Sequence, residues 1–288
     1  MSGLKQQGIM MIPALYIVAT PIGNLDDMSR RAVSVLQQVD CIAAEDTRHS
    51  TRLLQHYDIR TRLQAYHEFG GDGQLDSLFR YLEQGRSVAL ISDAGTPLIS
   101  DPGYRLVRRV QDAGIAVVPV PGPSAVIAAL CASGQATDRF CFEGFLPARA
   151  NARRESLQAL ANEPRSMVFY EAPHRIVACL VDMADIFGGE RQITLARELT
   201  KTFETIVRKP LADMSQWVAA DGNQQRGEIV LVVEGRSAGR NDGMNDEARR
   251  LVTLLIDDLP PQMLSKRVAE YCRLPKKQVY DYILSLKK

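Results

Sequence analysis

Three turns rich in glycine and proline are the segments of this sequence best suited to hold a ligand. They occupy residues 19–25 (ATPIGNL), 92–103 (SDAGTPLISDPG) and 119–125 (PVPGPSA). Glycine lets the main chain approach a ligand closely and proline holds a turn rigid, but neither residue moves protons. Such turns offer N–H and C=O groups to a ligand with a carboxylate, a ribose and an adenine. A single turn of this kind would be unremarkable, whereas three at successive strand ends favour a ligand site.

The spacing of the glycines excludes two common nucleotide-binding loops. No G-x-G-x-x-G follows the first predicted strand, and no G-K-[ST] occurs in the chain. The turns therefore predict a ligand held by main-chain groups, without naming it.

The turns are positioned by short apolar strands that alternate with amphipathic helices. This alternation predicts a mostly parallel α/β sheet, in which ligands bind beyond the carboxyl ends of the strands. The expected strands cover residues 15–20, 40–44, 62–66, 87–91 and 116–120, and the expected helices cover residues 28–37, 47–56, 74–84, 103–113 and 124–132.

A second α/β unit follows a pause at residues 134–139. Its strands are expected at residues 140–145, 167–170, 192–196, 203–207 and 228–233, with helices at 150–161 and 173–187 and a short one before the last strand. Two of these strands, 192–196 and 203–207, are close enough in sequence to form an antiparallel pair. We expect an α/β fold of two domains, residues 1–134 and 135–235. A linker and a helical extension of about three segments should occupy residues 236–288.

Composition limits the classes of protein that remain. At 288 residues, 45% hydrophobic, 24% charged and with a net charge of +1, the chain is an ordinary globular protein of about two domains. A nucleic-acid partner would have to meet local basic patches. The five cysteines and four histidines show no disulfide or metal-ligand spacing, which predicts a reducing compartment and no metal site.

Two apolar stretches resemble membrane segments. Residues 9–19 follow a single lysine and lack a cleavage site, so a buried strand is expected there. Residues 113–137 are long enough to span a bilayer apart from the prolines at positions 119, 121 and 123, which would break a helix. No membrane association is expected.

Five ordered motifs resemble those of the tetrapyrrole-methylase family, class III methyltransferases that use S-adenosylmethionine. They are residues 92–103, 118–124 (VPVPGPS), 143–147 (EGFLP), 170–175 (YEAPHR) and 197–205 (RELTKTFET), and the similarity spans roughly residues 13–235. Relatives that act on tetrapyrroles carry a G-x-G-x-G-D turn where this chain has residues 20–25 (TPIGNL). The motifs are more similar to the branch of the family that methylates rRNA.

The resemblance implies two α/β domains with S-adenosylmethionine in the cleft between them, and a homodimer. It also implies methylation of the 2′-hydroxyl of a cytidine in the decoding centre of 16S rRNA, on the small ribosomal subunit, in the cytoplasm. Apolar contacts to the adenine are expected from the strand at residues 227–233, and Asp93 could instead cap a turn. The residues expected in the cofactor pocket by this match are Pro21, Gly23, Asp93, Ala94, Gly95, Thr96, Ser124, Phe145 and Leu146.

A ribose hydroxyl is weakly acidic, so a general base or a nearby cation would help to remove its proton. The candidates within the motif segments are Asp46, Glu171, Glu198 and Lys201. Glu171 could accept the proton, whereas Lys201 could stabilise an alkoxide, or act as a base if burial lowers its pKa. The alternative is that these charges pair with each other, as Glu198 and Lys201 would in a structural ion pair.

Arginines suit RNA phosphates because the guanidinium group donates two parallel hydrogen bonds. Residues 262–288 add seven basic and two acidic residues, which favours phosphate contacts or simply a solvated helical face. The residues expected to contact RNA are Arg48, Arg149, Arg153, Arg154, Arg175, Arg197, Lys276 and Lys277.

Two other functions fit the same residues. One is a small-molecule or protein methylase of this fold, of the porphyrinoid or diphthine type, and the other is a non-catalytic RNA-binding assembly factor. The sequence leaves open the identity of the base, the residues that select the cytidine, and the choice between free rRNA and the assembled subunit. It also leaves open whether the C-terminal helices contact RNA and whether dimerisation is required.

Overall fold

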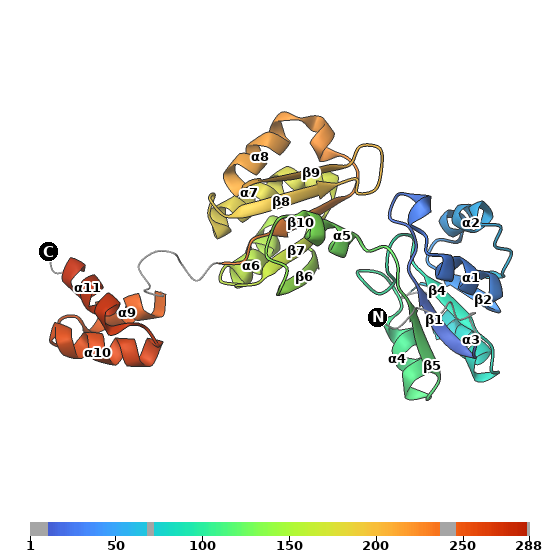
Figure 1. The fold of residues 1–288 in the computed structure, drawn as a ribbon, viewed down its shortest axis with the longest axis horizontal. Helices are drawn as coiled ribbons and strands as arrows, with labels where there is room; N and C mark the ends of the chain where they lie inside the picture. Colours follow the sequence, from blue (N-terminus) through green and yellow to red (C-terminus); the bar gives the residue numbers. More distant parts are fainter. Residues whose placement is uncertain (1–10, 68–71, 237–245, 287–288) are drawn as a thin grey trace, which may run out of the picture.

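The computed structural model describes residues 11–67, 72–236 and 246–286. It contains two five-stranded sheets, each flanked by helices, followed by a group of three helices at the C-terminal end (Figure 1). The expected fold class, two α/β sheets with a C-terminal helical extension, is confirmed.

The first sheet is entirely parallel, with the strand order β3-β2-β4-β1-β5. Its elements are β1 (Ala14–Val18), α1 (Arg30–Gln38), β2 (Cys41–Ala44), α2 (Thr47–His56), β3 (Leu63–Ala65), α3 (Asp72–Glu83), β4 (Val88–Ile91), α4 (Tyr104–Asp112) and β5 (Ala116–Val120). Helices α1 and α2 cover one face, against Tyr16 and Ile42, while α3 and α4 cover the other, against Leu15 and Leu90. Because both faces of the central strands β1, β2 and β4 are buried, these strands are apolar almost throughout.

The second sheet is mixed, with the strand order β6-β7-β10-β8-β9. Its elements are β6 (Phe140–Phe145), α6 (Ala150–Leu160), β7 (Ser166–Glu171), α7 (Ile176–Phe187), β8 (Gln192–Arg197), β9 (Thr205–Pro210), α8 (Leu211–Ala220) and β10 (Ile229–Val233). Strands β6 and β7 are parallel, and the other pairs are antiparallel. The expected pairing of the strands now labelled β8 and β9 is confirmed.

The last of these pairs begins later than the sequence pattern indicates. Strand β9 starts at Thr205 rather than at residue 203, and residues 198–204 form a turn. Within this turn Glu198 and Thr200 adopt φ angles of 51° and 67°, and the Lys201 N–H donates to the Glu198 carbonyl. Left-handed residues cannot continue a strand, so the turn ends the pairing early.

Helix α5 (Ala125–Ala132) follows the first sheet in sequence but packs on the second. Its residues Val126, Ala129 and Leu130 contact Val168 of β7 and Val230 of β10. The other face of that sheet is covered by α6, α7 and α8. The domain boundary predicted at residue 134 stays a prediction, and the packing of α5 indicates that the second unit recruits residues before it.

The C-terminal extension is formed by α9 (Asp246–Leu255), α10 (Pro261–Cys272) and α11 (Lys276–Leu286). These helices enclose a small apolar core of their own, which includes Val252, Leu264 and Ile283. Arg273 ends α10 in the left-handed conformation, with a φ angle of 54°, as is common at a helix C-terminus. The three expected C-terminal helices are therefore present.

The apolar stretch at residues 113–137 folds as β5, a turn and α5. In the described part of the chain, no helix combines the length and hydrophobicity needed to cross a bilayer.

Candidate active site

The three turns lie side by side because the strands that precede them, β4, β1 and β5, are neighbours in the first sheet. Thr20 and Gly95 exchange two main-chain hydrogen bonds, with N···O distances of 2.8 and 3.0 Å. The Thr96 hydroxyl donates to the Pro123 carbonyl at 3.0 Å. These bonds join the three turns into one continuous surface at the carboxyl edge of the sheet, where open α/β sheets bind ligands.

The turn at residues 92–103 is held in an unusual backbone conformation. Leu98 and Ser100 have φ angles of 73° and 66°, in the left-handed region that side chains disfavour. Gly103, with a φ of 136°, packs so closely on β4 that an added Cβ would lie 2.7 Å from Leu90 Cδ2. Such strain costs about 1–3 kcal/mol per residue and persists where the surroundings dictate it, commonly at functional sites. The turn therefore fixes the direction of Asp101.

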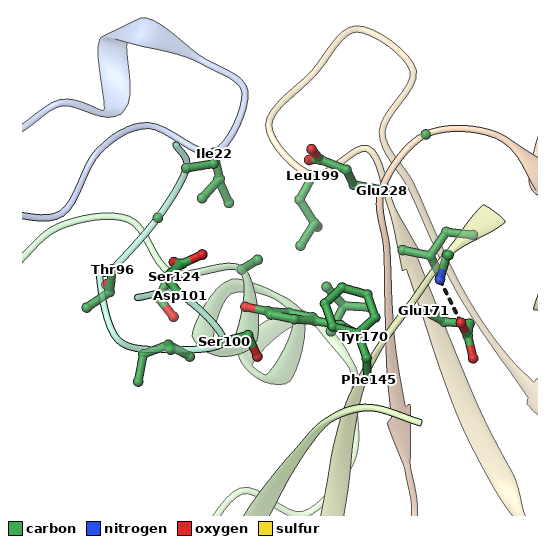
Figure 2. Close-up of a pocket in the computed structure, with 18 of the residues that line it drawn as sticks. Ile22, Thr96, Ser100, Asp101, Ser124, Phe145, Tyr170, Glu171, Leu199 and Glu228 are labelled. Carbon is green, nitrogen blue, oxygen red and sulfur yellow. Dashed lines mark hydrogen bonds between the residues drawn. The ribbon is translucent and has the colours of Figure 1, made fainter. Parts of the chain in front are cut away.

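The second sheet faces these turns with the surface that also carries α5. Side chains alternate along β7, so Val168 and Tyr170 lie on the α5 face, whereas Met167 and Phe169 lie on the opposite face. The Tyr170 ring contacts that of Phe145, the last residue of β6, with centroids 5.5 Å apart. The aromatic pair forms one wall of the space between the two sheets (Figure 2).

A cavity of about 370 Å³ occupies that space. Figure 2 shows residues of the first-sheet turns on one side and residues of the second sheet on the other. Among the described residues that line it, none is lysine or arginine. The lining residues are Ile22, Ala94, Gly95, Thr96, Ile99, Ser100, Asp101, Ser124, Ala125, Phe145, Tyr170, Glu171, Ala172, Pro173, Leu199, Gly227, Glu228, Ile229 and Val230.

The first-sheet side of the cavity is negatively charged. Burial raises the pKa of Asp101 to about 6, against the lowering effect of a hydrogen bond with Ser92, and the charges of Glu45 and Asp93 raise it further. Burial, together with the charge of Asp93, also raises the pKa of Glu45. Burial raises the pKa of Tyr170 to about 12, and the nearby Asp101 charge adds to this shift. At neutral pH, Tyr170 is therefore a neutral phenol beside a carboxylate.

Five of the nine residues expected to bind the cofactor line this cavity, namely Ala94, Gly95, Thr96, Ser124 and Phe145. The other four, Pro21, Gly23, Asp93 and Leu146, do not belong to its lining. Asp93 Oδ1 accepts a hydrogen bond from the Asp46 N–H at 3.1 Å, which joins the turn after β4 to the end of β2. Gly23 lies under the Lys201 side chain, and Leu146 is buried.

Glu171 lines the cavity, but its carboxylate points away from Tyr170 (Figure 2). As the next residue along β7, it projects to the opposite face of the sheet. There its Oε1 accepts from Arg175, with N···O distances of 2.6 and 2.9 Å, and from the Ala172 N–H at 2.7 Å. The side chain is 1% exposed. Its observed contacts hold the start of α7 against the end of β7.

Lys201 and Glu198 form the ion pair that was considered as a structural alternative. Lys201 Nζ lies 2.9 Å from Glu198 Oε1 and 3.0 Å from Glu228 Oε2. Partial burial of the amine lowers its pKa, but the hydrogen bonds to these two carboxylates outweigh it and leave the pKa of Lys201 above its usual value. The condition set for Lys201 as a base, a pKa lowered by burial, is therefore not met, and a role in stabilising negative charge stays a prediction.

Asp46, the third candidate, lies outside the cavity lining at the N-terminus of α2. Its Oδ1 accepts from the Arg48 N–H at 2.8 Å, and this hydrogen bond is the largest cause of its lowered pKa. The contacts are those of a helix N-cap.

The cations expected to contact RNA fall into two groups. Arg48, Arg149, Lys276 and Lys277 are exposed. Arg153, Arg154, Arg175 and Arg197 are bound to groups of the protein itself: Arg153 and Arg154 pair with Asp182, Arg175 with Glu171, and Arg197 donates to Gln224, Thr205 and the Phe203 carbonyl. All four arginines of the second group lie in the second unit, where they bind groups of the protein itself.

Several residues of the cavity lining, including Asp101 and Tyr170, were not among the sequence candidates. Asp101 occupies the same turn as Asp93, and residue type cannot decide which of two aspartates faces a ligand. The backbone decides it, through the left-handed residues Leu98 and Ser100. Tyr170 could have been found from the alternation along its strand, which places it and Glu171 on opposite faces.

Two packed α/β sheets with an aromatic and carboxylate-lined cavity between them define an architecture known among methyltransferases. A cobalt precorrin-4 methyltransferase of cobalamin biosynthesis superposes with a TM-score of 0.58 at 16% identity, covering 77% of this chain and 95% of that one. Uroporphyrin-III-C-methyltransferase from Thermus thermophilus gives a TM-score of 0.56 at 17% identity, covering 77% and 94%. At such identities these structures establish the fold alone.

The sequence establishes the family. The model of the tetrapyrrole (corrin/porphyrin) methylases matches residues 14–215. The chain is 54% identical to ribosomal RNA small subunit methyltransferase I of Pseudomonas aeruginosa, over 94% of this chain and 96% of that protein. It is 52% identical to the protein of the same name from Vibrio cholerae, over 94% of each chain. This protein therefore belongs to the tetrapyrrole methylase family.

Proposed function

We propose that this protein is an S-adenosylmethionine-dependent methyltransferase that methylates the 2′-hydroxyl of a cytidine in 16S rRNA of the small ribosomal subunit, in the cytoplasm. The observation that carries the proposal is the similarity of about 50% identity, along 93–94% of the chain, to proteins named ribosomal RNA small subunit methyltransferase I.

The cavity fits S-adenosylmethionine in size, polarity and charge. Its volume of about 370 Å³ lies in the range of small-molecule sites. The sulfonium of the donor is a cation, and the lining offers the carboxylates of Asp101 and Glu228 without a lysine or arginine among the described lining residues. Apolar side chains such as Leu199 and Ile229 suit the adenine. When bound, this cofactor supplies a methyl group that can pass to a nucleophilic oxygen.

The main chain around the cavity also leaves room and donors for such a ligand. Gly95, with a φ of 81°, lets the turn lie against Ile22, where an added Cβ would be 3.3 Å from Ile22 Cγ2. The first turn of α5 opens onto the cavity through Ser124 and Ala125, and Ser124 makes no side-chain capping hydrogen bond. Main-chain N–H groups at the start of a helix suit a carboxylate such as that of the methionine part of the cofactor.

The RNA would be bound by exposed cations on separate parts of the molecule. Arg48 follows the β2 end on the first unit, Arg149 precedes α6 on the second, and Lys276 and Lys277 begin α11 in the extension. We include a homodimer in the proposal, because the resemblance to the family implies one. Each unit then contributes to a long contact with a folded RNA, which suits recognition of rRNA by shape.

One experiment tests the function against its alternatives. Small ribosomal subunits and naked rRNA from a strain lacking the gene are incubated with labelled S-adenosylmethionine and the purified protein, and the labelled nucleosides are mapped. Label in a 2′-O-methylcytidine of 16S rRNA is the expected result. Cofactor binding without label in either RNA contradicts it and favours an assembly factor, or a methylase for a small molecule or protein.

A further inference from the structure

Among the described residues, four titratable side chains line the cavity, and three of them are unsuited to take a proton inside it. Glu171 points to the far face of the second sheet, where an arginine and a main-chain N–H bind it. Glu228 is 72% exposed, and its Oε2 accepts from Lys201. Tyr170 remains protonated at neutral pH. Asp101 is the remaining group among them that can accept a proton inside the cavity.

Asp101 has no cation beside it in the part of the chain that the structure describes. The groups that act on it come from each element packed around it: Ser92 and Asp93 from the end of β4, Glu45 from the end of β2, and Tyr170 from β7. Ser92 is uncharged, Asp93 and Glu45 are acidic residues, and Tyr170 is a neutral phenol. A carboxylate in such surroundings is a stronger base than one held in an ion pair.

The backbone keeps Asp101 at this place. It follows Ser100, one of the two non-glycine residues of its turn in the left-handed region, and lies two residues before Gly103, where an added Cβ would be 2.7 Å from Leu90 Cδ2. Ser100 also lies against the bulge in β6, where an added Cβ on Gly144 would be 3.5 Å from Ser100 Oγ. The turn is thus fixed by both sheets, so Asp101 occupies a defined position facing the aromatic wall.

We propose that Asp101 is the general base for methyl transfer, taking the proton of the acceptor hydroxyl inside the cavity. The inference rests on the proposed function. As the O–H bond breaks, the proton moves to the Asp101 carboxylate while the hydroxyl oxygen forms a bond to the methyl carbon. The carbon–sulfur bond breaks, its electron pair stays on sulfur, and the neutral Asp101 acid then releases its proton to solvent. Charge and atoms balance without a further reactant.

The electrostatics of the turn match this role. A general base works best when its pKa is close to the working pH. The pKa of Asp101, raised to about 6, leaves the group mostly ionised at pH 7.5 and more basic than an ordinary aspartate. The turnover rate should therefore decrease when the pH is lowered through about 6, because Asp101 becomes protonated.

A different role for Asp101 would be to stabilise the positive charge of the bound donor. The two roles predict different losses, because a counter-charge contributes to cofactor affinity whereas a base contributes to the chemical step. Asp101→Asn keeps the size of the side chain but cannot accept the proton. Cofactor affinity and single-turnover rate, measured separately, therefore distinguish the roles.

The experiment uses the full-length protein, S-adenosylmethionine, and small subunits from a strain lacking the gene. Asp101→Asn should lower the single-turnover rate by at least about 100-fold, the usual contribution of a positioned base. Its dissociation constant for the cofactor, measured by calorimetry, should change by less than about threefold. Asp112→Asn, an aspartate at the end of α4 with 75% side-chain exposure, is the matched control and should leave both values unchanged.

The pH profile supplies a second measurement. The logarithm of the wild-type single-turnover rate should rise with pH at unit slope and then level off, with a midpoint near pH 6. Glu45→Gln should move that midpoint to lower pH, because it removes a neighbouring acidic group. An Asp101→Asn rate within about fivefold of wild type overturns the inference, as does a loss confined to cofactor affinity or an unshifted midpoint in Glu45→Gln. Wild-type protein that methylates no rRNA overturns the proposed function and this inference with it.

Discussion

Two carboxylates of the second unit and two of the first unit are held in opposite ways. In the second unit, Asp182 and Glu198 pair with arginine or lysine, and their pKa values fall below the usual range despite burial. In the first unit, Glu45 and Asp101 lie near another acid, Asp93, and their pKa values rise. The described residues supply no ion-pair partner for Asp101.

The difference separates carboxylates that hold the structure together from those that cost stability. A buried acid that is paired on several sides gains little from proton transfer, because its charge is already compensated. An acid whose pKa is raised by burial and by nearby like charge destabilises the fold when it is ionised. Such groups concentrate at functional sites. By this criterion the first-sheet turns supply reactive groups, whereas the second unit supplies the wall of the cavity and its fixed charges.

The largest effect should come from breaking a pair in the second unit. Asp182→Asn leaves Arg153, whose side chain is 6% exposed, without its charged partner. Removing one partner of a buried pair costs about 3–5 kcal/mol, so we expect a loss in this range in the free energy of unfolding, measured by urea denaturation. A loss below about 1 kcal/mol would show that this pair is not structural, and would break the comparison.

A second test disturbs the place where the pairs of the second unit meet the cavity. Gly227 has a φ of 78°, and an added Cβ would lie 2.3 Å from Glu198 Oε1. Gly227→Ala should cost about 2 kcal/mol of stability through strain and displacement of Glu198. Cofactor binding measured by calorimetry should weaken as well, because Gly227 lines the cavity. Gly222→Ala, with open space around its Cβ position, is the matched control.

Replacing Asp101 should raise the stability of the protein at high pH, whereas the two substitutions above should lower it. Its ordinary pKa is 3.8 and its folded-state pKa is about 6, so the folded protein binds more protons between these values and loses stability as the pH rises through them. Asp101→Asn should therefore be more stable than wild type at pH 8, by about 1 kcal/mol after screening by solvent. Melting temperatures measured from pH 4 to pH 8 test this, and the advantage should vanish near pH 4. A variant less stable than wild type at pH 8 would contradict the comparison.

The smallest effect extends the comparison to the cations. Lys276 and Lys277 are exposed at the start of α11, whereas Arg165 is paired with Glu163. Replacing both lysines by alanine should reduce the slope of log affinity for rRNA against log salt by about 1–2, since each phosphate contact contributes just under one unit. Arg165→Ala should leave the slope nearly unchanged. Equal slopes for all three proteins would exclude the extension from the RNA contact.

The sequence pattern predicts the elements of the fold well because most of them obey a simple periodicity. Helix α2 and strands β5 and β6 have the bounds that were expected. The start of β9 was wrong by two residues, because the left-handed conformation of Glu198 and Thr200 is imposed by the contacts of their turn. Residue types alone give no reason for a non-glycine residue to adopt it.

The site was predictable as a location but not as a set of side chains. The three turns meet because their strands are neighbours, and five of the expected cofactor residues line the resulting cavity. Arg153 and Arg175, two of the arginines expected to contact RNA, have acidic partners 29 and 4 residues away in sequence, and the fold brings these partners together. Asp101 was missed because Asp93, an aspartate in the same turn, was chosen instead.

The packing of α5 has a consequence for the order in which the chain can fold during synthesis. The first sheet is complete once β5 has left the ribosome, but the apolar side of α5 has no full partner until β10 is made, about a hundred residues later. At about 5–20 residues per second, that delay lasts roughly 5–20 s. For this interval the nascent chain exposes Val126 and Leu130, a surface that a chaperone could hold. The cavity is then closed by one of the last strands to be translated.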